Sequence, residues 1–149
     1  MFSTSLLLLL LLAAVHCVHC VELIQPGSTV LNPGQSMSLT CKVSGYSLTD
    51  SNYCTDWIRQ PAGKALEWVG WICYDGGTGY SEKLKSRFQV SRDTSSSTVT
   101  LTGQNMQTED TAVYYCARVC SWSSASYFDY WGKGTSVTVT SAVQSAPKS

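Results

Sequence analysis

The stretch Glu109-Asp110-Thr111-Ala112-Val113-Tyr114-Tyr115-Cys116 closes the pattern that decides the fold. Cys41 ends an earlier run of alternating apolar and polar residues, and Trp57 follows Cys41 sixteen positions later. Two cysteines with a tryptophan between them, and a tyrosine two residues before the second cysteine, are typical of two β-sheets packed face to face. This frame predicts an all-β sandwich.

Short runs that alternate apolar and polar residues recur along the chain, and such alternation indicates strands with one buried face. Turn signals separate them, including Asn32-Pro33-Gly34-Gln35 and Asp75-Gly76-Gly77. No window sustains a helical period, and residues 81–85 and 107–110 are expected to form single short turns. We therefore expect about nine antiparallel strands in two sheets. Eight of them are expected at about residues 22–25, 37–43, 57–60, 66–72, 88–92, 98–102, 112–117 and 135–140.

Charge is sparse and balanced in this chain of 149 residues. Ten basic residues offset ten acidic ones, and no basic run stands out. A partner held mainly by charge, such as a nucleic acid or an anionic membrane, is therefore not expected.

The first twenty residues are typical of a secretory signal peptide. Residues 6–15 form an unbroken apolar run, shorter than the roughly 20 residues that a membrane-spanning helix needs. Val18 and Cys20 are small enough for the third-from-last and last positions before a cleavage site, so we expect cleavage after Cys20. The alternative is a buried core helix. Cleavage would remove His16 and His19, the only histidines, and secretion would permit disulfides.

Several motifs together resemble an antibody heavy-chain variable domain. They are Trp57-Ile58-Arg59-Gln60-Pro61, Leu66-Glu67-Trp68, Arg87-Phe88, residues 110–116 and Trp131-Gly132-Lys133-Gly134-Thr135. The resemblance covers residues 21–141 and implies the variable-type immunoglobulin sandwich, with residues 142–149 beginning a constant region. It also implies a disulfide from Cys41 to Cys116 between the sheets, with Trp57 packed against it and the Tyr114 hydroxyl tying down the preceding turn.

The resemblance assigns structural roles to four charged residues. Arg87 and Asp110 are expected to pair at the base of the domain, where register and specificity matter more than net stability. Arg118 and Asp129 are expected to pair at the base of the third loop. Gly132 and Gly134 are expected to allow a bulge near the last strand.

One sheet face is expected to meet a light-chain variable domain. Tyr115 lies between the inward Tyr114 and Cys116, so it points outward, and Ile58 alternates in the same way with Trp57. A large exposed apolar patch marks an interface. The alternative is that these side chains are core. The expected interface residues are Ile58, Gln60, Leu66, Trp68, Tyr115 and Trp131.

Three loops, at about residues 46–54, 72–80 and 118–130, are expected to cluster at one end of the sandwich. They are rich in Tyr, Trp, Ser and Gly, which is the composition of an antigen-binding surface. Trp71 and Asp56 could line the base of the site or support the framework. The candidate antigen-binding residues are Tyr53, Asp56, Trp71, Tyr74, Asp75, Tyr80, Trp122 and Tyr127.

Three further cysteines, Cys54, Cys73 and Cys120, fall one in each loop. A bridge between Cys54 and Cys73 is favoured over one between Cys54 and Cys120, and either choice leaves an odd thiol. A zinc site from three thiolates is the less favoured alternative, because it lacks a fourth ligand and the compartment is oxidising.

The sequence favours a binding domain over an enzyme. After cleavage no histidine remains for a Ser-His-Asp or Cys-His site, and no Gly-rich phosphate loop is present. We expect no cofactor and no metal. The alternative function is that of a cell-surface receptor or adhesion domain with the same fold. The motif Trp131-Gly132-Lys133-Gly134 favours an antibody over this alternative. The chain is expected outside the cell, secreted or held at the membrane only by parts not present here.

Overall fold

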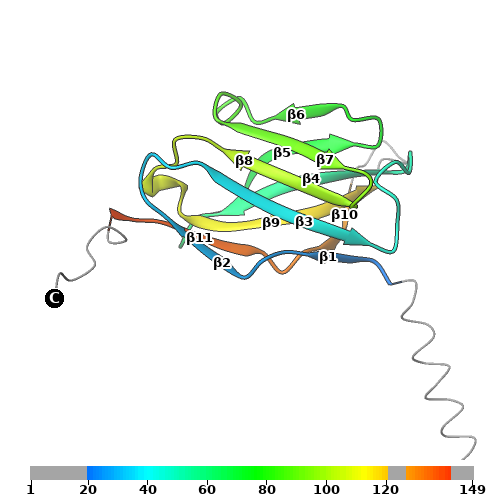
Figure 1. Ribbon diagram of the computed structural model, residues 1–149, viewed down its shortest axis with the longest axis horizontal. Helices are drawn as coiled ribbons and strands as arrows, with labels where there is room; N and C mark the ends of the chain where they lie inside the picture. The colour runs from blue at the N-terminus through cyan, green and yellow to red at the C-terminus, as the bar shows by residue number, and fades with distance from the viewer. Residues whose placement is uncertain (1–19, 121–126, 142–149) are drawn as a thin grey trace, which may run out of the picture.

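The computed structural model describes residues 20–120 and 127–141, which form two β-sheets packed face to face (Figure 1). Residues 1–19 of the expected leader, Trp122 and residues 142–149, the expected start of a constant region, lie outside these described residues. The first sheet contains β1 (Glu22–Ile24), β3 (Met37–Ser44), β8 (Thr98–Gly103) and β7 (Phe88–Asp93), in the order β1-β3-β8-β7.

The second sheet contains seven strands. Six of them follow the order β2-β11-β9-β4-β5-β6, and β10 is an additional strand that pairs with β9. The strands are β2 (Ser28–Leu31), β11 (Thr135–Val139), β9 (Ala112–Cys120), β4 (Tyr53–Gln60), β5 (Glu67–Cys73), β6 (Thr78–Tyr80) and β10 (Tyr127–Trp131). A short 3-10 helix, η2 (Thr108–Asp110), confirms one of the two expected turns, and backbone hydrogen bonds from Leu84 and Lys85 to the Ser81 carbonyl confirm the other.

The all-β sandwich is confirmed, but two details of the expectation are wrong. The described chain has eleven strands rather than about nine, and β2 pairs with β11 in parallel. The first strand expected over residues 22–25 is confirmed as β1, and β2 is a further strand that the sequence did not predict, in the other sheet. Pro26 lacks a backbone N–H and Gly27 is permissive, so the chain leaves the first sheet there and joins the second.

The core lies between the sheets and contains the disulfide from Cys41 on β3 to Cys116 on β9. The two strands belong to opposite sheets, so the bond joins the layers. Trp57 and both cysteines are fully buried in one apolar cluster. Inward positions on β3 alternate strictly with exposed ones, as a half-buried strand requires. The cluster also includes Met37, Leu39, Val43, Val69, Val90, Val99, Leu101, Met106, Val137 and Val139.

The base of the sandwich is closed by a buried network around Asp110. The Tyr114 hydroxyl donates to the Asp110 carbonyl at 2.8 Å, which is the tyrosine corner. The Arg87 guanidinium meets the Asp110 carboxylate through two hydrogen bonds of 2.9 Å. Arg59, only 4% exposed, donates to the same carboxylate at 2.9 Å and also to Glu67 at 2.8 Å. The sequence predicted the Arg87 contact but not that of Arg59.

Electrostatics hold Asp110 ionised in this network. Burial by itself would raise the pKa of Asp110, but hydrogen bonds from Arg87, the Gln107 backbone N–H and Arg59 outweigh it and lower the pKa to about 2. A carboxylate surrounded by donors in this way prefers its charged form. The network therefore contributes its full stability above pH 3.8, where Asp110 is also ionised in the unfolded chain, and this contribution is lost as the pH falls towards 2.

Candidate antigen-binding tip and partner face

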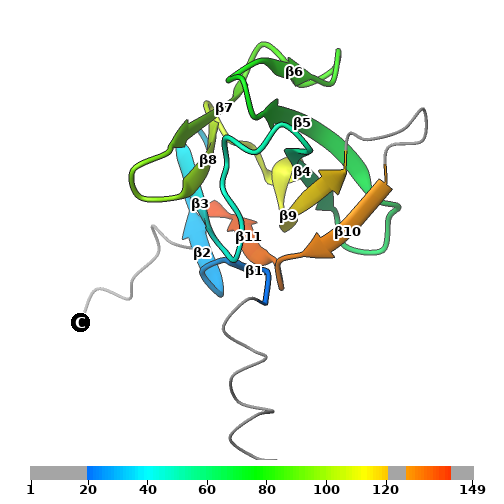
Figure 2. The same ribbon diagram turned by 90° about the vertical axis from the view of Figure 1, so that its right-hand side faces the viewer.

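The first two predicted loops and the described ends of the third, residues 118–120 and 127–130, gather at one end of the sandwich, at the right of Figure 1 and facing the viewer in Figure 2. Arg118, on β9, lies at their junction. Its guanidinium carbon is 3.9 Å from the centre of the Tyr53 ring and 4.8 Å from those of Tyr46 and Tyr130. Asp129 accepts two hydrogen bonds from Arg118, of 2.6 and 3.1 Å. Cation–π contacts and an ion pair thus join the first loop to the base of the third.

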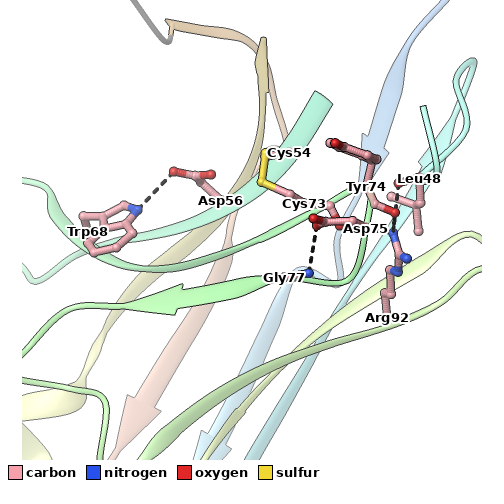
Figure 3. The surroundings of a disulfide bond; sticks show 9 residues. All are labelled: Leu48, Cys54, Asp56, Trp68, Cys73, Tyr74, Asp75, Gly77 and Arg92. Atoms are coloured by element: carbon pink, nitrogen blue, oxygen red, sulfur yellow. Dashed lines mark hydrogen bonds between the residues drawn. A yellow bond between two sulfur atoms is a disulfide. The ribbon is translucent and has the colours of Figure 1, made fainter. Parts of the chain in front are cut away.

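Arg92 joins the first loop to the second. Its Nη1 donates to the backbone carbonyls of Leu48 at 3.1 Å, Cys73 at 3.1 Å and Tyr74 at 2.7 Å (Figure 3). Arg92 lies on β7, in the opposite sheet from β5, so it reaches across the sandwich to hold both loops. Sequence reasoning missed Arg92, because nothing in a strand's alternation shows which distant carbonyls a long side chain will meet.

Cys54 and Cys73 form a disulfide at this tip, with Cα atoms 4.0 Å apart (Figure 3). They occupy directly opposite positions on the antiparallel pair β4 and β5. The alternative bridge from Cys54 to Cys120 is not formed. Cys120 lies opposite Tyr53, the neighbour of Cys54, and successive residues on a strand point to opposite faces. Cys120 is therefore left without a disulfide, and the three thiolates of the zinc alternative are not available together.

We expect the double change Cys54→Ser with Cys73→Ser to lower the free energy of unfolding by about 3 kcal/mol, from the closure entropy of a loop of this length. Urea denaturation of the secreted chain measures this. Cys120→Ser is the matched control and should leave the midpoint unchanged, since Cys120 is unbridged. Equal midpoints for the double variant and the parent would contradict the prediction.

The remaining tip candidates divide between exposed and framework positions. Tyr74 is exposed. Asp75 is also exposed, and it accepts a hydrogen bond from the Gly77 backbone N–H at 3.0 Å, so Asp75 also stabilises its own turn.

Half-buried Trp71 packs close to Gly79 on the neighbouring strand. Tyr80 packs against the core and its hydroxyl accepts from the Val90 backbone N–H at 2.9 Å, a placement that favours a framework role over antigen contact. β10 begins at Tyr127, whose side chain lies outside the described part.

Asp56 lies on the outward face of β4, below the disulfide, and is only 9% exposed. Its carboxylate accepts a hydrogen bond from the Trp68 indole N–H at 3.0 Å (Figure 3). Burial raises the pKa of Asp56 to about 6, and the Trp68 hydrogen bond only partly opposes this shift. Asp56 is thus a buried acid that is poorly compensated when it is ionised.

Asp56→Asn is expected to stabilise the protein by about 3 kcal/mol at pH 7.5, because the pKa rises from 3.8 to about 6 on folding. The folded state binds this proton more tightly, so stability is greatest below pH 3.8 and is lost as the pH rises through 6. Urea denaturation at pH 3.5 and pH 7.5 measures the difference, which should vanish at the lower pH. A gain of the same size at both pH values would contradict this assignment.

The predicted partner face carries a cluster of exposed large apolar side chains, which we call the aromatic face. Tyr115 meets Trp131 edge to face, with ring centres 6.0 Å apart, and Phe128 lies 5.0 Å from Trp131. Sequence reasoning missed Phe128, because residues 118–130 were expected to form a loop and Phe128 lies instead on strand β10. The exposed members are Leu66, Trp68, Phe128 and Trp131, with Tyr115 half-buried. Tyr130 is also exposed, but it lies opposite Arg118 and stacks on it, away from this face.

Ile58 does not contribute exposed surface as expected. It lies on the outward face but is only 4% exposed, because Trp68 and Tyr115 are directly opposite it on the two neighbouring strands. It therefore supports the aromatic face from beneath. Gln60 is exposed, and its amide donates to the Lys64 carbonyl at 3.3 Å. Gly134 has a φ of +91° just before β11, and Gly132 lies so close to Gln25 that a Cβ would clash with it.

Comparison with known proteins places these features in a family. Residues 24–140 match the immunoglobulin V-set domain. The Mus musculus Ig heavy chain V regions MOPC 141 and MOPC 315 are 50% identical over 125 residues and 49% identical over 120 residues, respectively. The Xenopus laevis Ig heavy chain V region XIG14 is 46% identical over 119 residues. Each alignment covers 80% of this chain and 85% of the relative.

The chain belongs to the immunoglobulin V-set family. Within that family it is similar to heavy-chain V regions of both mouse and frog, which confirms the resemblance drawn from its motifs. In residues 20–120 and 127–141, no helix is both long and apolar enough to span a membrane. The same residues contain no group of three or more His, Cys, Asp or Glu side chains placed to hold a metal ion.

Proposed function

We propose that the chain is the variable domain of an antibody heavy chain, which pairs with a light-chain variable domain and binds antigen with its tip. In this proposal residues 1–20 are a cleaved leader, residues 21–141 are the domain and residues 142–149 begin a constant region. The domain acts outside the cell, and it acts as a binding module rather than an enzyme. The relatives named above support the heavy-chain assignment.

The observation that carries the pairing proposal is the aromatic face. Leu66 is 53% exposed and Trp131 is 42% exposed, on the same face as Trp68 and Phe128. Contiguous apolar surface of this kind is costly in water and marks an interface. Aromatic residues are also enriched at interfaces, because they bury large areas with little loss of rotamer freedom.

The tip supports the antigen-binding part of the proposal. Exposed Tyr74 and half-buried Tyr53 lie on a support made rigid by Arg118, Arg92 and the Cys54–Cys73 disulfide. A rigid support lowers the entropy lost on binding, so a site built in this way binds more tightly for the same contacts.

The pairing test uses the full chain, secreted and mixed with a light-chain variable domain, with complex formation followed by sedimentation. Leu66→Glu is expected to weaken pairing by at least tenfold, because it places a charge inside the interface. Val30→Glu is the matched control: Val30 is 55% exposed on β2, outside the aromatic face, and its replacement should leave pairing unchanged. Equal affinity for both variants, or no complex with any light-chain domain, would reject the proposal.

A further inference from the structure

The outward face of the second sheet is continuous from the disulfide-bridged tip to the aromatic face, and Asp56 lies where the two meet. On β4, outward positions run from Cys54 through Asp56 to Ile58. Asp56 is opposite Trp71 on β5 and Ala117 on β9. Its hydrogen bond to Trp68 connects it directly to a member of the aromatic face.

No charge faces Asp56 from the described elements packed around it. Its own strand presents Cys54 and Ile58 on that face, β5 presents Trp68, Trp71 and Cys73, and β9 presents Tyr115, Ala117 and Val119. Tyr115 is the only titratable group among them. Arg118 alternates to the other face and is paired with Asp129, while Glu67 is paired with Arg59 at the base. Residues 121–126 carry no ionisable side chain in the sequence.

We propose that docking of a partner on the aromatic face is linked to uptake of a proton by Asp56, so that the complex tightens as the pH falls. A partner that covers Trp68 removes water from the adjoining carboxyl group, which has one hydrogen-bond donor and no cation to replace it. Loss of water penalises an ionised carboxylate far more than a neutral carboxyl group. This inference rests on the proposed pairing with a light-chain domain.

The sign and the pH window follow from the free domain, in which burial already raises the pKa of Asp56 to about 6. Docking raises the pKa further, so the paired state holds the proton more tightly than the free state does. Affinity is then highest below pH 6 and falls as the pH rises through 6 towards the higher pKa of the paired state. Each unit of further pKa rise corresponds to a tenfold change in the dissociation constant.

Few other groups titrate in this window. Both histidines precede residue 20, so the domain itself offers none. Asp110 ionises near pH 2, well outside the range of the experiment. A histidine on the partner would act equally on any variant of this chain, and comparison of variants therefore isolates the contribution of Asp56.

The experiment measures the dissociation constant of the full secreted chain and a light-chain variable domain at pH 5.5, 6.5, 7.5 and 8.5. From pH 5.5 to pH 8.5, the dissociation constant of the parent should rise at least threefold more than that of the Asp56→Asn variant. The variant should match the low-pH affinity of the parent throughout, because an amide is neutral and still accepts the Trp68 hydrogen bond. Parallel profiles for parent and variant, or a parent that pairs less tightly at low pH, would overturn the proposal.

A second measurement does not depend on the variant folding. The pKa of Asp56, followed through its carboxyl carbon signal by NMR, should rise when the unlabelled light-chain domain is added. A fall in the pKa of Asp56 would show that the partner supplies a hydrogen-bond donor or a cation to the carboxylate. An unchanged pKa would show that the partner does not cover Asp56. Either result rejects the linkage. Pairing with parallel pH profiles rejects only this inference, whereas absence of a complex at every pH rejects the proposed pairing as well.

Discussion

Replacing Cys41 or Cys116 with alanine is expected to lower the free energy of unfolding by about 4.5 kcal/mol and to reduce secretion sharply. The bond closes a loop with a sequence separation of 75, and closure of a loop of that length restricts the unfolded chain by about this amount. Both cysteines are fully buried, so truncation also leaves a small cavity beside Trp57. The total is comparable to the whole stability of a small domain.

The measurement is urea denaturation of whatever variant is secreted, together with the secreted yield. Because the loss approaches the total stability, a low yield with a strongly lowered midpoint is the expected combination. The double variant Cys54→Ser with Cys73→Ser should be less affected than either, since its bond closes a much shorter loop. A Cys116→Ala variant that is secreted and unfolds like the parent would refute the account of the core.

Replacing Asp110 with alanine is expected to lower the free energy of unfolding by about 3–5 kcal/mol, because it leaves Arg59 buried without one of its two carboxylate partners. The change also removes the acceptor of both Arg87 hydrogen bonds and of the Gln107 backbone N–H. Uncompensated burial of a cation is the main cost, since Arg59 cannot lose its proton at any ordinary pH.

The control is Glu82→Ala. Glu82 accepts a hydrogen bond of 2.7 Å from Lys85, which is shorter than the ion pairs of Arg59 and Asp110 at the base of the domain. Both side chains of this pair are largely exposed to water. Its removal should cost less than about 1 kcal/mol. The two variants thus compare a buried and an exposed ion pair by the same urea denaturation experiment. Equal losses would show that the Asp110 network is not buried as described.

The Asp110 network also predicts a pH dependence. Folding lowers the pKa of Asp110 from 3.8 to about 2, so its stabilising effect is complete above pH 3.8 and is lost as the pH falls towards 2. The parent should therefore lose stability over this range more steeply than Asp110→Ala, in which the titrating group is absent.

The sequence predicted those features that depend on spacing and strand alternation. The inward positions of Trp57 and Cys116 were predicted from their spacing in the Cys–Trp–Cys pattern. Cys41 occupies an inward position in a run that alternates apolar and polar residues. The same alternation placed Tyr115 outward, where the structure has it. The place of Tyr114 two residues before Cys116 indicated the tyrosine corner, since that motif is local to one turn and one strand.

Features that depend on the neighbours of a residue could not be predicted in this way. Alternation gives the face of Ile58 but not the degree to which Trp68 and Tyr115 cover it. The sequence placed Arg59 in a family motif but did not predict its burial or its ion pair with Asp110, because both depend on which distant carboxylates lie nearby. Composition gave no indication that the chain would form a further strand, β2, in the other sheet after Pro26.

The most direct test of the central claim, that a partner domain docks on the aromatic face, is an NMR titration of the tryptophan indole N–H signals. The chain has five tryptophans, and substitution of each in turn assigns its signal. On addition of a light-chain variable domain, we expect the signals of Trp68 and Trp131 to shift while that of Trp57, fully buried in the core, stays in place. A complex that forms without moving Trp68 or Trp131 would contradict the account, because its interface would lie elsewhere.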